Sequence, residues 1–199
     1  GDLGVCGGTL EVFLEPVLRS DPFWVIGAGH VGRALISLGR TLSFRFVLVD
    51  DRPEVLASLP ADLPCRTLNC PPEGLAGHLE IPARGAMLMA SRNVELDGEY
   101  LEAVLAAERE AGREFTFLGG IASRTKAALL RRRLEAAGSD QDRLERLQLP
   151  VGVAVGGETP AEIALSVLAE AQAALRGITP LADEQGRPLG LPFQRRRQR

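Results

Sequence analysis

Short apolar runs alternate along the chain with longer stretches in which apolar residues recur at helical spacing. Residues 23–26 form a continuous apolar run, which is typical of a strand covered on both faces. Apolar residues at spacings of three and four then predict a helix over 31–42, and 44–50 is a second apolar run that ends in Asp50. The main body of the chain therefore begins in the order strand, helix, strand.

The same alternation continues toward the C-terminus, with weaker segments at 65–68 and 75–79. The pattern predicts further strands at 86–90, 115–118 and 151–155, and helices at about 97–111, 123–137, 140–148 and 159–176. Strands that alternate with helices indicate a parallel sheet with helices on both faces. We therefore expect the α/β class and a doubly wound parallel sheet.

Capping residues mark where several of these helices begin and end. Asp97 and Ser123 each stand at the start of a helical stretch and are good N-caps, and Gly138 ends the second of these helices. Thr159 forms a capping box with Glu162, directly before an apolar run. The last helix is therefore expected to begin at Thr159.

The two ends of the chain differ from this body. Residues 9–14 form a β-rich run after a glycine-rich turn, so we expect residues 1–20 to be the remnant of an N-terminal domain that carries one β segment. Residues 21–178 are expected to form the main domain. Residues 179–199 are rich in proline and glycine and end in arginines, which predicts a disordered basic tail.

Composition narrows the class of protein. The 199 residues are 45% hydrophobic and 25% charged, with a formal net charge of -3, which excludes a disordered chain and a strongly nucleic-acid-binding one. The three cysteines show no paired metal spacing, so neither a disulfide scaffold nor a zinc site is indicated. No apolar run approaches the ~18 residues of a membrane span. We expect a cytoplasmic protein with no membrane or nucleic-acid partner.

Gly27, Gly29 and Gly32 follow the first apolar run and form a GxGxxG pattern. In such a pattern the first glycine permits a tight turn, the second lets a diphosphate approach the backbone, and the third allows the helix to pack close to the sheet. Asp50 ends the next strand, where an acid that binds a ribose belongs. The pattern predicts a Rossmann-like unit; the alternative is that the glycines serve packing alone.

Few residues offer acid–base chemistry. His30 lies inside the glycine loop, where it could face a bound phosphate or merely cap the turn. Tyr100 is the only tyrosine and Lys126 the only lysine, and they lack the spacing of the tyrosine–lysine pair used in hydride transfer. The sequence supplies a nucleotide-like cradle without obvious catalytic residues, so we expect the chain not to be an enzyme.

Two further glycine loops are candidate anion sites. Ser123 and Arg124 follow one Gly-Gly pair at the start of a predicted helix, and Glu158 and Thr159 follow another pair at 156–157. Both loops are expected at the carboxyl edge of a parallel sheet, where ligands bind. Glu158 and Thr159 have an equally good alternative as ordinary helix-capping residues.

Cys6 precedes two glycines, Gly7 and Gly8. Flanking glycines leave the sulfur accessible, and nearby backbone donors favour the thiolate. The alternative is a small buried residue, which is the usual place of a free cysteine. Residue type alone does not decide whether Cys6 is a ligand or a packing residue.

Taken in order, these motifs resemble the xanthine dehydrogenase accessory proteins of the XdhC/CoxI type. The resemblance extends over about residues 5–176 and rests on CGGTLEV at 6–12, VIGAGHVGRAL at 25–35, VDDRPE at 49–54, IASRTK at 121–126 and GGETPAEIALSVLAE at 156–170. Each segment is modest alone, but together in this order they are specific. The resemblance implies a Rossmann-like C-terminal domain preceded by the remnant of the family's N-terminal domain.

Proteins of this family bind the molybdenum cofactor (molybdopterin), protect it while a cysteine desulfurase supplies sulfur, and deliver it to a xanthine dehydrogenase-type molybdenum hydroxylase. The resemblance therefore implies a cofactor chaperone, for which a homodimer is the default. It also implies that Cys6 is a soft ligand for molybdenum. The cofactor-binding residues expected are Cys6, Gly7, Gly8, Gly27, Gly29, His30, Gly32, Asp50, Ser123, Arg124, Glu158 and Thr159.

The GxGxxG pattern with Asp50 leaves a different class of protein open. It suits an NAD(P)-dependent oxidoreductase, and also a Rossmann-like domain that senses a nucleotide. Titration with NAD and NADH would distinguish these classes, because a dehydrogenase binds both and turns over a substrate.

Overall fold

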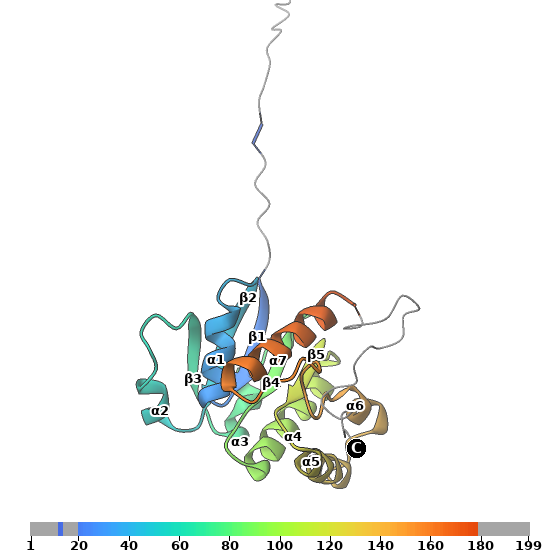
Figure 1. Cartoon of the computed structure of the whole chain (residues 1–199). Coiled ribbons are helices and arrows are strands. Elements are labelled where there is room, and N and C mark those ends of the chain that lie inside the picture. The colour runs from blue at the N-terminus through green and yellow to red at the C-terminus, as the bar shows by residue number, and fades with distance from the viewer. Residues whose placement is uncertain (1–11, 14–19, 179–199) are drawn as a thin grey trace, which may run out of the picture.

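The computed structural model describes residues 12–13 and 20–178, and its centre is a sheet of five parallel strands (Figure 1). In order across the sheet these are β3 (Cys65–Asn69), β2 (Phe44–Asp50), β1 (Asp21–Ile26), β4 (Ala86–Met89) and β5 (Phe117–Gly120). Every neighbouring pair is parallel. The doubly wound, Rossmann-like parallel sheet predicted from the alternation is confirmed.

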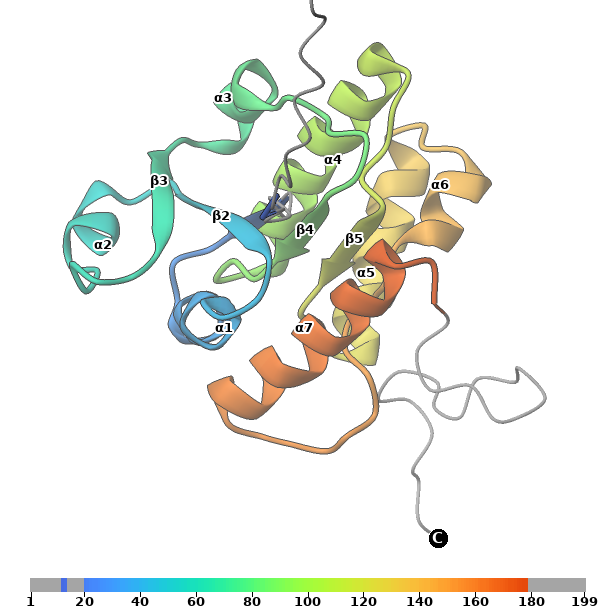
Figure 2. The ribbon, with the colours of Figure 1, turned by 90° about the horizontal axis from the view of Figure 1, so that it is seen from above.

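Helices cover both faces of the sheet (Figure 2). They are α1 (His30–Gly39), α2 (Pro53–Ala57), α3 (Pro72–Leu75), α4 (Val94–Ala111), α5 (Arg124–Ala136), α6 (Gln141–Arg146) and α7 (Pro160–Leu175), with a short 3-10 helix at Ala76–His78. Side chains alternate between the two faces along each buried strand. In β1, Phe23 and Val25 therefore pack in one core with α1 and α7, whereas Trp24 and Ile26 pack in the other with α3, α4 and α5.

The order of the strands places a crevice between β1 and β4. The chain leaves β1 through α1 to reach β2 and β3 on one side, and then returns through α3 to β4 on the other side of β1. In open α/β sheets, ligands bind beyond the carboxyl ends of the strands where the strand order reverses in this way. The turn after β1 and the segment after β4 therefore border the expected ligand site.

The structure corrects the predicted start of α4. Asn93 is the N-cap, and its Oδ1 accepts a hydrogen bond from the Leu96 N–H at 2.8 Å. Asp97 was the predicted cap, but it lies within the helix and is fully buried. Both residues suit a cap by type, and only the packing of α4 distinguishes them.

The strand predicted over 151–155 is also wrong, because no strand forms over these described residues. The Val151 N–H donates to the Gly120 carbonyl oxygen at 3.1 Å, so the chain does run beside β5 for a short distance. Gly152 then adopts a φ of +109°, which breaks the extended conformation. Glu170 stabilises this turn by accepting a hydrogen bond from the Gly152 N–H at 2.6 Å.

Other local predictions are confirmed. Ser123 caps α5, and Thr159 and Glu162 form the capping box of α7. The weak segment at 75–79 becomes the end of α3 and the 3-10 helix, and α2 was not predicted. The expected N-terminal remnant with its β segment and the expected basic tail at 179–199 lie, apart from residues 12–13 and 20, outside the described residues. No helix within residues 20–178 is both long and apolar enough to span a membrane.

Candidate functional site

A cavity of ≈ 400 Å³ occupies the crevice at the carboxyl ends of β1 and β4. The glycine loop after β1, the acidic end of β2 and residues 90–92 after β4 line most of it. Leu96 and Tyr100 from α4, Ile121 after β5 and Lys126 from α5 complete the lining. The volume is within the range of small-molecule sites, roughly 300–1,000 Å³.

The three glycines of the GxGxxG pattern differ in why they are needed. A Cβ on Gly27, which has a φ of +116°, would lie 2.3 Å from the Ala90 carbonyl oxygen, and a Cβ on Gly32 would lie 2.2 Å from the Gly27 carbonyl oxygen. Packing therefore requires both glycines. Gly29 also lines the cavity, but nothing lies within 4 Å of the position that its Cβ would take. Packing does not explain Gly29, whereas close approach of a ligand to the backbone does.

The N-terminus of α1 has the features of an anion site. Gly29 is its N-cap, no side chain caps the helix, and its first turn holds no acidic residue. Free N–H groups and the positive end of the helix dipole favour an anion here. His30 is exposed at the first helical position and lines the cavity. The structure thus brings Gly29 and His30 together at one open helix end.

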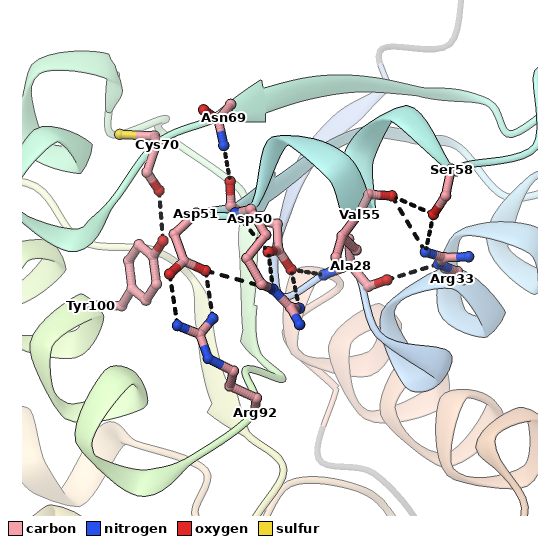
Figure 3. Close-up of polar contacts among 11 residues, drawn as sticks. Ala28, Arg33, Asp50, Asp51, Val55, Ser58, Asn69, Cys70, Arg92 and Tyr100 are labelled. Atoms are coloured by element: carbon pink, nitrogen blue, oxygen red, sulfur yellow. Dashed lines mark hydrogen bonds and ion pairs between the residues drawn. The ribbon is translucent and has the colours of Figure 1, made fainter.

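Asp50 lies beside this loop, as predicted, but its carboxylate is fully engaged (Figure 3). Oδ2 accepts from the Ala28 N–H at 2.8 Å and from Nη2 of Arg52 at 3.0 Å. Oδ1 accepts from the backbone N–H and Nε of Arg52 at 3.1 and 2.9 Å. Burial acts to raise the pKa of Asp50, but these hydrogen bonds outweigh it and lower the pKa.

A carboxylate has about four acceptor positions, and Asp50 already accepts four hydrogen bonds. Asp50 therefore has no acceptor left for a ribose hydroxyl while Arg52 stays in place. Its predicted role as a ribose-binding acid stays a prediction that this geometry does not favour.

An ion pair between Asp51 and Arg92 joins the loops after β2 and β4 (Figure 3). The Arg92 guanidinium donates to both carboxylate oxygens, at 2.6 and 2.8 Å. The hydrogen bond from Arg92 lowers the pKa of Asp51. Because β1 lies between β2 and β4, this pair connects the two sides of the crevice.

A second ion pair lies deeper, between Asp97 and Lys126. Asp97 has no exposed surface, and its Oδ1 accepts from the Ser91 N–H at 3.1 Å. Its buried Oδ2 has the Lys126 ammonium as its partner. The sequence pattern did not predict this pair, since an aspartate near a helix start indicates a cap. The feature that could have indicated it is the position of the only lysine of the chain beside a glycine loop.

Two further contacts fix the walls of the cavity (Figure 3). Arg33 of α1 donates to the Ala28 carbonyl oxygen at 2.8 Å and to Ser58 Oγ at 3.1 Å, which ties the glycine loop to the end of α2. The Tyr100 hydroxyl donates to the Cys70 carbonyl oxygen at 2.6 Å, and burial raises the pKa of this phenol. Tyr100 is therefore a structural hydrogen-bond donor at the cavity wall.

Comparison with known families identifies this domain. The family model described as the XdhC Rossmann domain matches residues 23–171, from β1 into α7. The chain belongs to the XdhC family. The predicted resemblance is confirmed over this range.

Relatives of this XdhC domain are larger proteins. The chain is 34% identical over 168 residues to the uncharacterized protein YqeB of Escherichia coli (strain K12), a match that covers 83% of this chain and 29% of that protein. A crystal structure described as a xanthine dehydrogenase from Bacillus halodurans superposes with a TM-score of 0.64 at 21% identity, over 79% of this chain and 45% of the other. This second likeness shows the fold.

The two other glycine loops of the XdhC domain differ from the loop after β1. Ser123 Oγ accepts from the Lys126 N–H at 3.2 Å, which caps α5, and Arg124 is exposed at the first position of that helix. At α7, the Glu162 carboxylate accepts from the N–H groups of Glu158 and Thr159, both at 2.9 Å. The capping interpretation of Glu158 and Thr159 thus describes their contacts, and their contact with a cofactor stays a prediction, as it does for Ser123 and Arg124.

The predicted metal ligand Cys6, with Gly7 and Gly8, lies outside the described residues, so its role stays a prediction. Within residues 12–13 and 20–178, no group of three or more His, Cys, Asp or Glu side chains is placed to hold a metal ion. Cys65 is partly buried and Cys70 is buried, and burial raises the pKa of both thiols. Neither of these described cysteines resembles an activated thiolate.

Proposed function

We propose that this XdhC domain binds the molybdenum cofactor and belongs to an accessory protein that delivers the cofactor to a xanthine dehydrogenase-type molybdenum hydroxylase. The observation that carries the proposal is the open N-terminus of α1 at Gly29, on the wall of a ≈ 400 Å³ cavity at the point where the strand order reverses. Membership of the XdhC family and the likeness to the Bacillus halodurans structure support it.

The residues present fit the phosphate-bearing part of such a cofactor. The backbone N–H groups of the first turn of α1 would hold the phosphate, with His30 beside it, and the bare Gly29 leaves room for close approach. When bound, the cofactor supplies a molybdenum centre whose redox chemistry belongs to the enzyme that receives it. The role of this chain is to bind, orient and shield the cofactor, with Cys6 as a candidate soft ligand for the metal.

The proposal includes two partner proteins. A molybdenum hydroxylase of the xanthine dehydrogenase type would receive the cofactor, and a cysteine desulfurase would supply sulfur while the cofactor is bound. A homodimer is the expected assembly. Asp50 and Asp51 in the cavity wall, and Asp97 beneath it, are each engaged by a cationic side chain.

The state of Asp50 argues against an NAD-dependent oxidoreductase. A ribose 2′-hydroxyl needs an acceptor at this position, and Arg52 occupies both oxygens of the carboxylate. Arg52 could meet the 2′-phosphate of NADP only by leaving Asp50. NAD is therefore expected to bind weakly.

Equilibrium binding of isolated molybdenum cofactor tests the proposal. Gly29→Val should weaken binding about tenfold or more, because the side chain would fill the space left for the ligand; tenfold corresponds to about 1.4 kcal/mol. Gly77→Val is the matched control, since Gly77 is exposed, lies in the 3-10 helix and also has nothing within 4 Å of its Cβ position. Cys6→Ser should weaken binding of the cofactor separately.

Two outcomes would contradict the proposal. Equal binding of the cofactor by Gly29→Val and Gly77→Val would show that the site does not lie at the N-terminus of α1. Alternatively, NAD could bind the chain tightly while isolated cofactor does not, which would favour the nucleotide-binding alternative. Urea unfolding of both variants should show changes of no more than about 1 kcal/mol, the scale of an N-cap substitution.

A further inference from the structure

We infer that the ligand site has a second, uncharged compartment between the β5–α5 loop and α7, and that this compartment takes the ring system of a ligand whose anionic end lies at α1. The inference rests on the proposed function for the identity of that ligand, which makes the ring a pterin. It adds a subsite and divides the ligand into two chemically different parts.

The second cavity has a volume of ≈ 310 Å³ and a lining unlike that of the first. Its walls are apolar side chains from three segments of the chain, chiefly Ile121, Pro150, Val153 and Ile163. No charged side chain is among the residues that line it, whereas Asp50, Asp51, Arg52, Arg92 and Lys126 all line the first cavity. The two compartments therefore select for different chemistry.

The two cavities adjoin at Ile121, which lines both. Ile121 follows β5 directly, and its N–H donates to the Met89 carbonyl oxygen at 2.8 Å, so the residue is fixed at the end of β4. The first turn of α5 lies beside it, with Ser123 lining the second cavity and Lys126 the first. One ligand that passes Ile121 would occupy both compartments.

The second cavity is unsuited to an anion, although two helices begin near it. The N-terminus of α5 is capped by Ser123, and that of α7 is capped by Thr159 and by the Glu162 carboxylate. These caps use the N–H groups that an anion would need, and the negative charge of Glu162 would repel one. The phosphate of a ligand is therefore expected at α1 and not at α7.

The polar atoms that line the second cavity suit the edge of a ring. Ser166 Oγ donates to the Ile163 carbonyl oxygen at 2.8 Å and can still accept a hydrogen bond. Ser123 Oγ accepts from the Lys126 N–H and can still donate one. A few hydrogen-bonding groups in an apolar wall are typical of sites for heterocyclic ligands. An uncharged pterin ring, with donors and acceptors along its edge, matches this wall.

A bulky substitution at Ile163 tests the inference. Ile163 is partly buried on the first turns of α7, and Ile163→Trp would fill the second cavity, with Ile163→Phe as a milder variant. Leu165→Trp is the matched control, because Leu165 lies on the same helix and is 57% exposed. The probes are isolated molybdenum cofactor, a phosphate-free pterin and inorganic pyrophosphate.

We expect Ile163→Trp and Ile163→Phe to weaken binding of the cofactor by about tenfold or more, and to abolish binding of the phosphate-free pterin, with pyrophosphate affinity unchanged. Gly29→Val should weaken the binding of pyrophosphate and of the cofactor but not that of the phosphate-free pterin. Leu165→Trp should bind every probe with the affinity of the wild-type chain.

Equal binding of the cofactor by Ile163→Trp and Leu165→Trp would overturn the second compartment and leave the proposed function standing. A loss of pyrophosphate affinity in the Ile163 variants as large as their loss of cofactor affinity would also overturn it, because the two compartments would then not be separate. Failure of the wild-type chain to bind the cofactor would refute the proposed function, and the inference with it.

Discussion

The glycine loops before α1 and α7 differ in whether the N-terminus of the helix stays available to a ligand. The loop after β1 leads into α1, and the loop at 156–157 leads into α7. The third helical residue after each N-cap makes the difference. In α1 this residue is Gly32, which has no side chain, whereas in α7 it is Glu162, whose carboxylate accepts from two backbone N–H groups. A glycine loop before a helix therefore indicates an anion site only when the helix does not cap itself.

The side chains around the two loops also differ in charge. Around the α1 loop, three buried or partly buried carboxylates are each paired with a cationic side chain, so the cavity wall is polar and close to neutral. Beside the α7 loop, the second cavity has no charged lining residue. An incoming phosphate would meet open N–H groups at α1 and an occupied helix end at α7.

The largest expected effect comes from the first glycine of the α1 loop. Gly27→Ala should lower the free energy of unfolding by about 3 kcal/mol or more, because the new Cβ would meet the backbone of Ala90 at a φ of +116°. Urea unfolding measures this. Gly77→Ala, at an exposed position without a neighbour, should change stability little. A fully stable Gly27→Ala variant would mean that the loop does not pack against Ala90.

The ion pair beneath the cavity should give the next largest effect. Lys126→Met would leave Asp97 buried without its cationic partner, which should cost about 3 kcal/mol of stability. The double variant Lys126→Met with Asp97→Asn should recover much of that loss, because no charge then stays buried. A double-mutant cycle in urea unfolding measures the coupling, and additive single effects would show that the pair does not interact.

Asp50 gives a prediction that depends on pH. Asp50→Asn should lower stability by about 2 kcal/mol at pH 7, since it removes charged hydrogen bonds from Arg52. The folded-state pKa of Asp50 is lowered from 3.8, so this stabilisation is present above that value and is lost as the pH falls below it. Unfolding curves of both proteins should converge in acid, and a difference that persists unchanged at low pH would contradict the assignment.

The smallest effect is expected at the α7 loop. Thr159→Ala should lower stability by about 1 kcal/mol, the usual cost of removing an N-cap hydroxyl. Cofactor binding should not change, because the Thr159 side chain caps α7 and does not line either cavity. Thermal unfolding and cofactor titration give the two readings. Weakened cofactor binding in a stable Thr159→Ala variant would show that Thr159 belongs to the binding site. The α1 and α7 loops would then not differ in the way described above.

Local patterns predicted much of the fold. The apolar run at 44–50 corresponds to β2 residue for residue, and Ser123 and Thr159 cap the helices they were expected to cap. Two predictions failed where the sequence offered equivalent choices. Asp97 and Asn93 are both good caps, and 151–155 has strand-like composition but contains Gly152, whose positive φ ends the pairing with β5.

Part of the site was also predicted from local sequence patterns. Gly27, Gly29, Gly32 and His30 are neighbours in sequence, so their place at the start of α1 followed from the strand and helix around them. Arg52, Arg92 and Lys126 were not predicted to line the cavity. They come from segments far apart in the chain. The order of the strands brings the loops after β2 and β4, with Arg52 and Arg92, to one crevice, and the packing of α5 against the sheet adds Lys126.

The amino-acid sequence by itself determined most of the alternation of strands and helices, the glycine turn after β1 and the membership of the XdhC family, because these depend on neighbouring residues and on motif order. Only the tertiary structure decided which of the two glycine loops is open to an anion, whether the carboxylate of Asp50 is available, and where Asp97 is buried. Each depends on hydrogen bonds and ion pairs whose partners are set by how the helices and loops pack around the sheet.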